Sequence, residues 1–234
     1  MDKLKFLSIY DNNDLSCEMW LQLSIRLQEE SKRNGNENKK RYKKVNSNEE
    51  NKELNEKGMK FIPKNDNSFS GILNHLRTKS NGKIENEVSI NASSIYDNSN
   101  NHQPFNVVSY ENTFGELYSK DQPNNWLCFD FKEHRIIPTD YTIKSYHVEK
   151  NYRSPKSWAI EVSNDNSSWE IIDEQNDCSY LNGSLLTHTF HIQKQQNKKI
   201  RYIRMRSTGP CWNGQHYLNV GRFEHKETLH FVKH

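Results

Sequence analysis

The stretch that decides the fold is SWAIEVSNDNSSWEIIDEQ, residues 157–175. Two segments with alternating apolar residues, 158–163 and 169–174, flank the run Asn-Asp-Asn-Ser-Ser. The short polar side chains of such a run are typical of turns because they bond to nearby backbone groups. Two strands joined by such a turn make a β-hairpin. We therefore predict two antiparallel strands here, with Trp158 opening the inward-facing side of the first.

Segments with a similar alternation of apolar and polar residues occur on both sides of the hairpin. Further strand-like segments lie at 88–96, 125–131, 141–150, 187–192, 199–207 and 218–225. No helical pattern of useful length follows residue 80. Short strands at this spacing predict an all-β sandwich or barrel. A region of about 155 residues is long enough to bury a core without disulfides or metals.

The first 67 residues have a different character. Residues 14–30 carry a narrow apolar stripe at every fourth position, which predicts a short amphipathic helix. The following segment almost lacks apolar residues, so it cannot offset its chain entropy and is predicted to be a disordered charged linker. Four parts result: an N-terminal segment 1–30, a linker 31–67, the β-sandwich 68–226 and a C-terminal tail 227–234.

Composition and charge exclude several classes of function. The net charge of +3 over 234 residues does not supply the concentrated basic face that nucleic-acid binding needs. No apolar run approaches the ~20 residues that span a bilayer, so membrane insertion is not expected. The four cysteines, Cys17, Cys128, Cys178 and Cys211, match no metal motif and indicate reduced thiols in the cytoplasm. The run KKRYKK, 39–44, resembles a nuclear-import patch, which leaves the nucleus as an alternative, although a solvated charge run is the simpler interpretation.

Four segments in order carry a resemblance to a known family. They are INASSIY (90–96), NNWLCFDF (124–131), WAIEVSNDNSSWEII (158–172) and IRYIRMRSTGPCWNGQHYLNVGRFEH (200–225). Together they resemble the F5/8 type C (discoidin) domain of the galactose-binding-like superfamily. The resemblance implies a jelly-roll β-sandwich. It is most similar to the intracellular branch found with BTB-domain proteins and ubiquitin-ligase subunits, and no cysteine lies near residues 69 or 225 to form the disulfide of secreted members.

The resemblance also implies that ligands bind on loops at one end of the sandwich. Those loops are 93–106, 147–157 and 207–217. Trp212, between two turn dipeptides, is either a ligand anchor or a lid over the sandwich end. Arg153 either grips a carboxylate or a sugar hydroxyl or is a solvated loop residue. The ligand-binding candidates are Trp212, Asn213, His216, Tyr152, Arg153, Tyr96 and Asn106.

No catalytic, metal or cofactor site is predicted. The sequence has no nucleophile elbow, P-loop, dinucleotide fingerprint or HExxH, and no catalytic constellation. The prediction is a non-enzymatic recognition module whose partner is another protein, such as a BTB-type or ubiquitin-ligase assembly. The alternative is a lectin-like module that binds a glycan through the same loops. A glycan site needs convergent hydrogen-bonding groups beside an aromatic platform, whereas a protein site needs a larger apolar patch.

Overall fold

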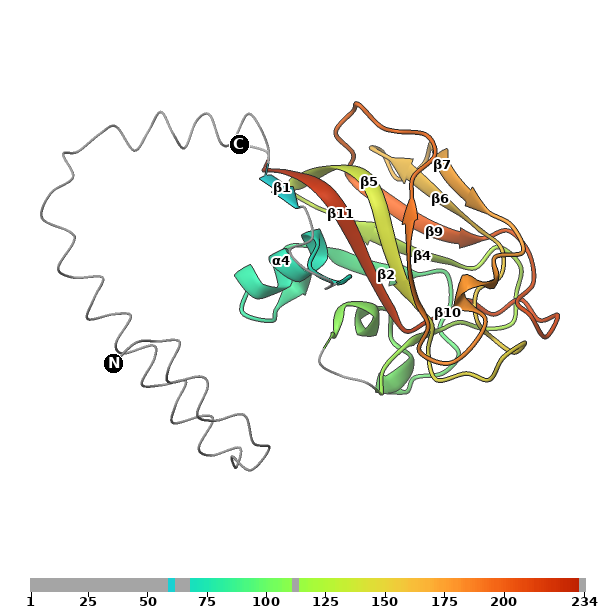
Figure 1. Cartoon of the computed structure of the whole chain (residues 1–234). Coiled ribbons are helices and arrows are strands. Elements are labelled where there is room, and N and C mark those ends of the chain that lie inside the picture. Colours follow the sequence, from blue (N-terminus) through green and yellow to red (C-terminus); the bar gives the residue numbers. More distant parts are fainter. Residues whose placement is uncertain (1–58, 62–67, 111–113, 232–234) are drawn as a thin grey trace, which may run out of the picture. The chain divides into compact units, whose positions relative to one another are not determined.

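The computed structural model describes residues 59–61, 68–110 and 114–231 and shows an antiparallel β-sandwich (Figure 1). The predicted helix at 14–30, the run KKRYKK and Cys17 lie outside the described residues. One sheet has the strand order β2 (Ser89–Ala92), β4 (Trp126–Asp130), β9 (Tyr202–Ser207), β6 (Trp158–Ser163) and β7 (Glu170–Gln175). The other has the order β1 (Met59–Phe61), β11 (Arg222–Phe231), β5 (His134–Lys144) and β8 (Thr187–His191).

Smaller elements close the two ends of the sandwich. A third sheet pairs β10 (Asn219–Val220) with β3 (Leu117–Tyr118). One α-helix, α4 (Ile72–Lys79), contacts β11. Short 3₁₀ turns form η2 (Ile84–Asn86), η3 (Asn100–His102), η4 (Pro104–Val108) and η5 (Ser179–Leu181). The predicted all-β sandwich is therefore confirmed.

The hairpin forms where the sequence predicts it. β6 pairs antiparallel with β7, and Asp165 holds the turn by accepting hydrogen bonds from the backbone N–H groups of Ser167 (2.8 Å) and Ser168 (2.7 Å). These bonds stabilise the carboxylate and lower the pKa of Asp165. Asn166 adopts φ = 58°, a left-handed conformation that Asn tolerates. Trp158 is fully buried, as the predicted register requires.

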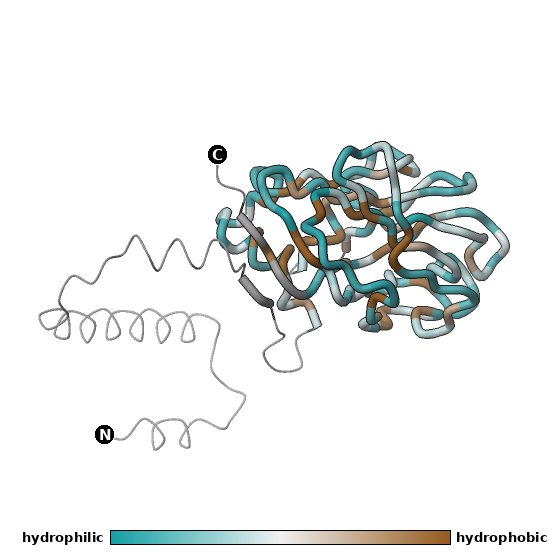
Figure 2. Tube along the Cα trace, turned by 90° about the horizontal axis from the view of Figure 1, so that it is seen from above, coloured by the Kyte–Doolittle hydropathy of each residue, from teal (hydrophilic) through white to brown (hydrophobic). Residues whose placement is uncertain are grey.

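The core lies between the two larger sheets. Its largest fully buried side chains include Phe129, Phe131, Tyr141 and Phe223 beside Trp158. Figure 2 shows hydrophobic positions gathered along the strands of the interior, with hydrophilic positions in the outer loops. Strand alternation therefore sorts the side chains into an inner and an outer set.

The arginines of β9 and its start belong to the outer set. Arg204 and Arg206 both bond to Glu161, with Arg206 Nη2 2.7 Å from Oε1. Arg201 Nε lies 2.8 Å from Asp130 Oδ1. All three guanidiniums are thus bonded to two carboxylates, with Glu161 shared by Arg204 and Arg206, which is not the arrangement of a phosphate-binding face.

The largest differences from the predicted strands concern β5, β1 and β11. β5 begins at His134 and ends at Lys144, whereas the alternation suggested 141–150. Pro138 lies beside a register irregularity with β11 and beyond the end of β8, where a missing N–H is tolerated. β1 lies inside the predicted linker 31–67, and β11 continues past residue 226 to Phe231. The remaining domain limits stay predictions.

Helix α4 was not predicted, because FSGILNHL has a mixed period. Its first turn is held by the buried carboxylate of Glu224, which accepts hydrogen bonds from the N–H groups of Leu73 (2.8 Å) and Asn74 (3.0 Å). Gly71 permits this close approach, since a Cβ there would lie 2.2 Å from the carbonyl oxygen of His225. A residue 150 positions away thus fixes the helix.

Replacing His225 by phenylalanine is expected to reduce the acid sensitivity of the fold. The ring of His225 is fully buried against Phe129, Phe131 and Phe223, and both nitrogens lack a hydrogen-bond partner among the described residues. Burial lowers its pKa from 6.5 to about 3, so the unfolded chain binds a proton that the folded chain does not. This histidine therefore costs stability as pH falls below 6.5, by about 1.4 kcal/mol per pH unit down to its folded pKa.

Urea unfolding at several pH values measures this effect. Between neutral pH and pH ~5, His225→Phe should lose less unfolding free energy than the unmodified chain, with the difference growing as pH falls. At neutral pH the unfolding free energies of His225→Phe and of the unmodified chain should be close, because the apolar phenylalanine ring replaces an imidazole that makes no hydrogen bond to the described residues. Parallel pH profiles would show that His225 does not titrate in this way.

Candidate ligand-binding site at the end of the sandwich

The site is built on the short sheet of β3 and β10. Tyr118 of β3 lies opposite Asn219 of β10. The backbone N–H of Tyr96 donates to the carbonyl of Tyr118 at 2.8 Å, and that of Glu116 donates to the carbonyl of Asn101 at 2.8 Å. These bonds fold the predicted loop 93–106 onto β3. Side chains from segments far apart in the sequence consequently meet at this end.

Four rings form what we call the tyrosine cluster, consisting of Tyr96, Tyr118, Tyr217 and His102. Tyr96 stacks on Tyr118 with ring centroids 4.5 Å apart and planes inclined by 24°. Tyr217 lies 5.0 Å from Tyr118, and His102 meets Tyr118 edge-on at 5.4 Å. Tyr118 is buried, whereas Tyr96 is 48% exposed. The cluster therefore presents the exposed ring of Tyr96 and the half-buried rings of Tyr217 and His102 on the buried ring of Tyr118.

Arg153 lies against the cluster from the loop 147–157. Its guanidinium carbon is 4.4 Å from the ring centroid of Tyr118 and 5.2 Å from that of Tyr152. Contacts of a guanidinium with aromatic rings restrict the side chain and contribute about 0.5–2 kcal/mol. The buried Nε has no hydrogen-bond partner among the described residues. Tyr152 is 43% exposed beside it. Arg153 is thus held in place against the rings, with its buried Nε–H unpaired among the described residues.

A buried carboxyl group completes the site. Glu116 is 3% exposed and accepts a hydrogen bond from the amide of Asn219. Burial raises its pKa to about 7, although the Asn219 hydrogen bond and the nearby Arg153 and His102 favour the carboxylate. His102 lies between two carboxyls, with Nε2 3.7 Å from Glu116 Oε1 and Nδ1 2.7 Å from Asp97 Oδ1. Of these two carboxyls, only Asp97, whose side chain is 46% exposed, can be reached by a ligand beside the aromatic rings.

The predicted loops adjoin one another, although Trp212 stays apart from the cluster. The N–H of Asn213 donates to the carbonyl of Tyr152 at 3.1 Å, which joins the loops 207–217 and 147–157. Trp212 is half-buried, and Lys156 Nζ lies 5.2 Å from its ring centroid. Within the described part of the chain, no ring contact links Trp212 to the tyrosine cluster. Whether Trp212 is a ligand anchor or a lid over the sandwich end stays a prediction with two alternatives.

The other predicted candidates have structural contacts. Asn106 is 2% exposed, and its amide donates to the carbonyls of Asn100 (2.8 Å) and Glu116 (3.3 Å). The buried side chain of Asn106 therefore holds the loop 93–106 through these bonds. The side chain of Asn213 accepts a bond from the N–H of Gln215, and the N–H of His216 donates to Asp121 Oδ1 at 2.7 Å. These contacts fix the loop 207–217.

Sequence reasoning missed the residues on which the site is built. Tyr118 and Glu116 lie on or next to β3, a strand of two residues that is too short to show any periodicity. His102 and Tyr217 fall inside the predicted loops but were not singled out. The only available signal was the concentration of aromatic residues and histidines in those loops.

The described residues give three further findings. They contain no group of three or more histidine, cysteine or acidic side chains arranged to hold a metal ion. No helix among them is both long and apolar enough to cross a bilayer. Cys128, Cys178 and Cys211 are buried free thiols.

Comparison with known proteins finds similar chains only among solved structures. No family model and no curated protein sequence matches this chain. A family 32 carbohydrate-binding module from Clostridium perfringens, in complex with GalNAc-β-1,3-galactose, is 13% identical, with a TM-score of 0.48 over 61% of this chain and 96% of that chain. A chitosan-binding module from Paenibacillus is 14% identical, with a TM-score of 0.46 over 59% of this chain and 94% of that chain. An F5/8 type C domain from Bacteroides fragilis is 10% identical, with a TM-score of 0.47 over 64% of this chain and 95% of that chain.

Proposed function

We propose that this chain is a non-catalytic glycan-binding module whose site is the tyrosine cluster with Arg153 and Glu116. The observation that carries the proposal is the half-exposed ring of Tyr96, stacked on Tyr118, with the guanidinium of Arg153 against Tyr118 and the exposed carboxylate of Asp97 on His102. Sugars present a C–H face that packs on an aromatic ring and hydroxyls that both donate and accept. A ring with an adjacent donor and acceptor matches both features.

The same geometry favours the glycan over a protein partner. Anchors of protein interfaces are large apolar or aromatic side chains that fill a pocket on the partner, surrounded by a contiguous apolar patch. At this end of the sandwich, the charged guanidinium of Arg153 contacts both the exposed ring of Tyr152 and the ring of Tyr118 on which Tyr96 stacks. The adaptor role in a BTB-type or ubiquitin-ligase assembly, and the cytoplasmic location, stay predictions without support from the site.

The charges at the site indicate the class of sugar. Arg153 alone would favour an acidic sugar, because a guanidinium binds a carboxylate with two hydrogen bonds. Arg153 lies close enough to Glu116 for its charge to lower the pKa of that carboxyl. When Glu116 is ionised, it offsets the positive charge of Arg153. Above about pH 7, where Glu116 is ionised, it would repel a second carboxylate from a ligand. At such pH we therefore expect a neutral sugar to bind better than a uronic or sialic acid.

Tyr96→Ala is expected to weaken binding by about tenfold or more, because it removes the exposed ring that packs on the sugar. A glycan array probed with the full chain should first identify the preferred sugar, and calorimetric titration then compares the variants. Tyr180→Ala is the matched control, since Tyr180 is 62% exposed and stacks on His188 outside the tyrosine cluster. It should bind as the unmodified chain does. An array without any bound glycan, or equal loss in both variants, would overturn the proposal.

A further inference from the structure

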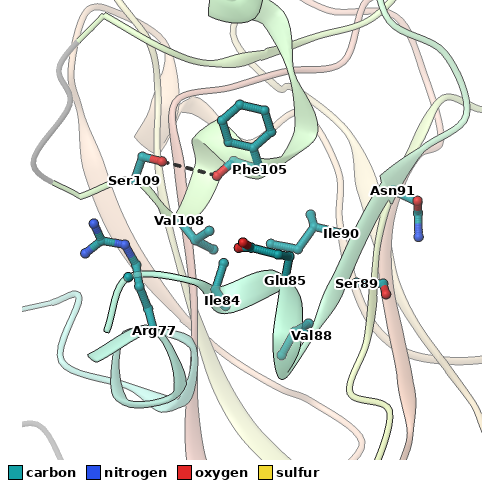
Figure 3. A pocket seen from close by; sticks show the side chains of 11 residues that line it. Arg77, Ile84, Glu85, Val88, Ser89, Ile90, Asn91, Phe105, Val108 and Ser109 are labelled. Carbon is teal, nitrogen blue, oxygen red and sulfur yellow. Dashed lines mark hydrogen bonds between the residues drawn. The ribbon is translucent and has the colours of Figure 1, made fainter. Parts of the chain in front are cut away.

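A pocket of ≈ 650 Å³ lies beside strand β2, between η2 and η4 (Figure 3). Its volume falls within the range of ligand-binding pockets. The buried side chains of Ile84, Val88 and Val108 line it together with Ile90. Phe105, at its border, is 51% exposed. None of the residues that line this pocket belongs to the tyrosine cluster.

The strand beside this pocket has an unpaired edge. In the described part of the chain, β2 pairs only with β4, so it is the outer strand of its sheet. The N–H of Ser93 donates to the carbonyl of Trp126, and hydrogen-bonded residues alternate along an antiparallel pair. Ile90 and Ala92, which are out of phase with Ser93, therefore direct their N–H and C=O groups away from β4. Such a row of free backbone groups can pair with another extended chain.

The direction of the side chains argues against a sugar in this pocket. Ser89, Ile90 and Asn91 all line the pocket, but only the side chain of Ile90 extends over its apolar floor, whereas those of Ser89 and Asn91 point the other way, as strand alternation requires (Figure 3). The amide of Asn91 and the hydroxyl of Ser89 therefore do not point toward the apolar floor of the pocket, where they could bind a sugar. What remains is an apolar floor beside a free strand edge, and a peptide strand complements both.

Charges on the border add selectivity. Arg77 and Glu85 also line the pocket and have opposite signs. In Figure 3 both side chains extend beside the apolar floor. A segment with an apolar side chain flanked by one acidic and one basic residue would match this arrangement.

We propose that the edge of β2 and this pocket dock an extended peptide segment of a partner protein, which adds a strand beside Ile90 and Ala92 and inserts an apolar side chain over Ile84, Ile90 and Val108. The backbone of the segment supplies hydrogen bonds to the free edge. Its apolar side chain supplies affinity by burial. Its two charged residues set the register against Arg77 and Glu85. This surface is independent of the glycan site.

A random nine-residue peptide library, displayed on phage and selected against the full chain, tests the proposal. The recovered peptides should share an apolar residue with charged residues of both signs nearby. In ¹⁵N–¹H spectra, a recovered peptide should shift the amides of Ile90 and Ala92 and slow their hydrogen exchange. Replacing its apolar residue by serine should weaken binding about tenfold or more.

Two variants distinguish this surface from others. Glu85→Lys, at an exposed position, should weaken a recovered peptide severalfold and favour its acidic over its basic flank. Glu174→Lys, the same charge reversal at an exposed position of β7 at the other edge of this sheet, should leave binding unchanged. The proposal is wrong if recovered peptides lack the pattern or bind Glu85→Lys equally. It is also wrong if a sugar, or raised concentration of the chain alone, shifts the amides of Ile90 and Ala92 instead.

Discussion

Glu224→Ala is expected to lower the free energy of unfolding by about 3–5 kcal/mol. Oε1 of this fully buried side chain accepts from the N–H groups of Leu73 and His225, and Oε2 accepts from the N–H of Asn74 and the hydroxyl of Tyr110. Removing the carboxyl leaves three N–H groups without their acceptor, whereas the hydroxyl of Tyr110 can still donate to the carbonyl of Phe223 at 3.0 Å. An unpaired buried polar group costs about 1–3 kcal/mol, and water entering the vacated space offsets part of that sum.

Denaturant unfolding followed by tryptophan fluorescence measures this loss. Tyr110→Phe is the control, because it removes only one of the four bonds and should cost about 1 kcal/mol. Glu224→Gln should fall between the two, since its amide nitrogen cannot accept a bond from the backbone N–H groups. A loss below about 1 kcal/mol for Glu224→Ala would mean that this carboxyl does not hold α4 on β11.

Trp158→Ala is expected to cost about 3–5 kcal/mol, the range for emptying a large aromatic site in a core. The indole is fully buried, and its ring packs edge-on against Phe190 at 5.2 Å. Its Nε1 donates to the hydroxyl of Tyr141 at 3.0 Å, which in turn donates to Asp173 Oδ2 at 2.7 Å. Asp173 is itself 2% exposed. The substitution therefore opens a cavity beside a buried polar chain.

Trp158→Phe separates the cavity from the hydrogen bond. It keeps much of the ring volume but loses the indole N–H, so a cost of about 1–3 kcal/mol is expected. Thermal and urea unfolding of both variants provide the comparison. Equal losses would assign the effect to the hydrogen bond, and a loss under about 1 kcal/mol for Trp158→Ala would contradict the register of β6.

The strands could be predicted because their signal is local. Alternation along 158–163 and the turn-forming Asp165 need no information from elsewhere in the chain. Helix α4 depends instead on the acceptor Glu224, which lies 151 residues from Leu73. No window of sequence around residue 72 contains that partner.

The site residues likewise divide into those that could be predicted from nearby sequence and those that depend on distant strand pairing. Tyr96, Tyr152 and Arg153 were predicted because family resemblance placed their loops at one end. Tyr118 and Glu116 were missed, since β3 has only two residues and joins the site by pairing with β10 about 100 positions later. Asn106 was expected to face a ligand, yet a side chain that can bond to loop carbonyls is equally suited to burial beneath the loop.

The most direct test of the glycan-binding proposal is to map the amide chemical-shift changes that sugars cause on the full chain. A panel of neutral and acidic monosaccharides should be titrated and the affected residues assigned. We expect a neutral sugar to shift the amides of Tyr96, Tyr118, Arg153 and Tyr217 in a saturable way, with acidic sugars weaker and with Ile90 unaffected. If no sugar in the panel shifts these amides, or if the saturable shifts lie elsewhere on the sandwich, the tyrosine cluster is not a glycan site.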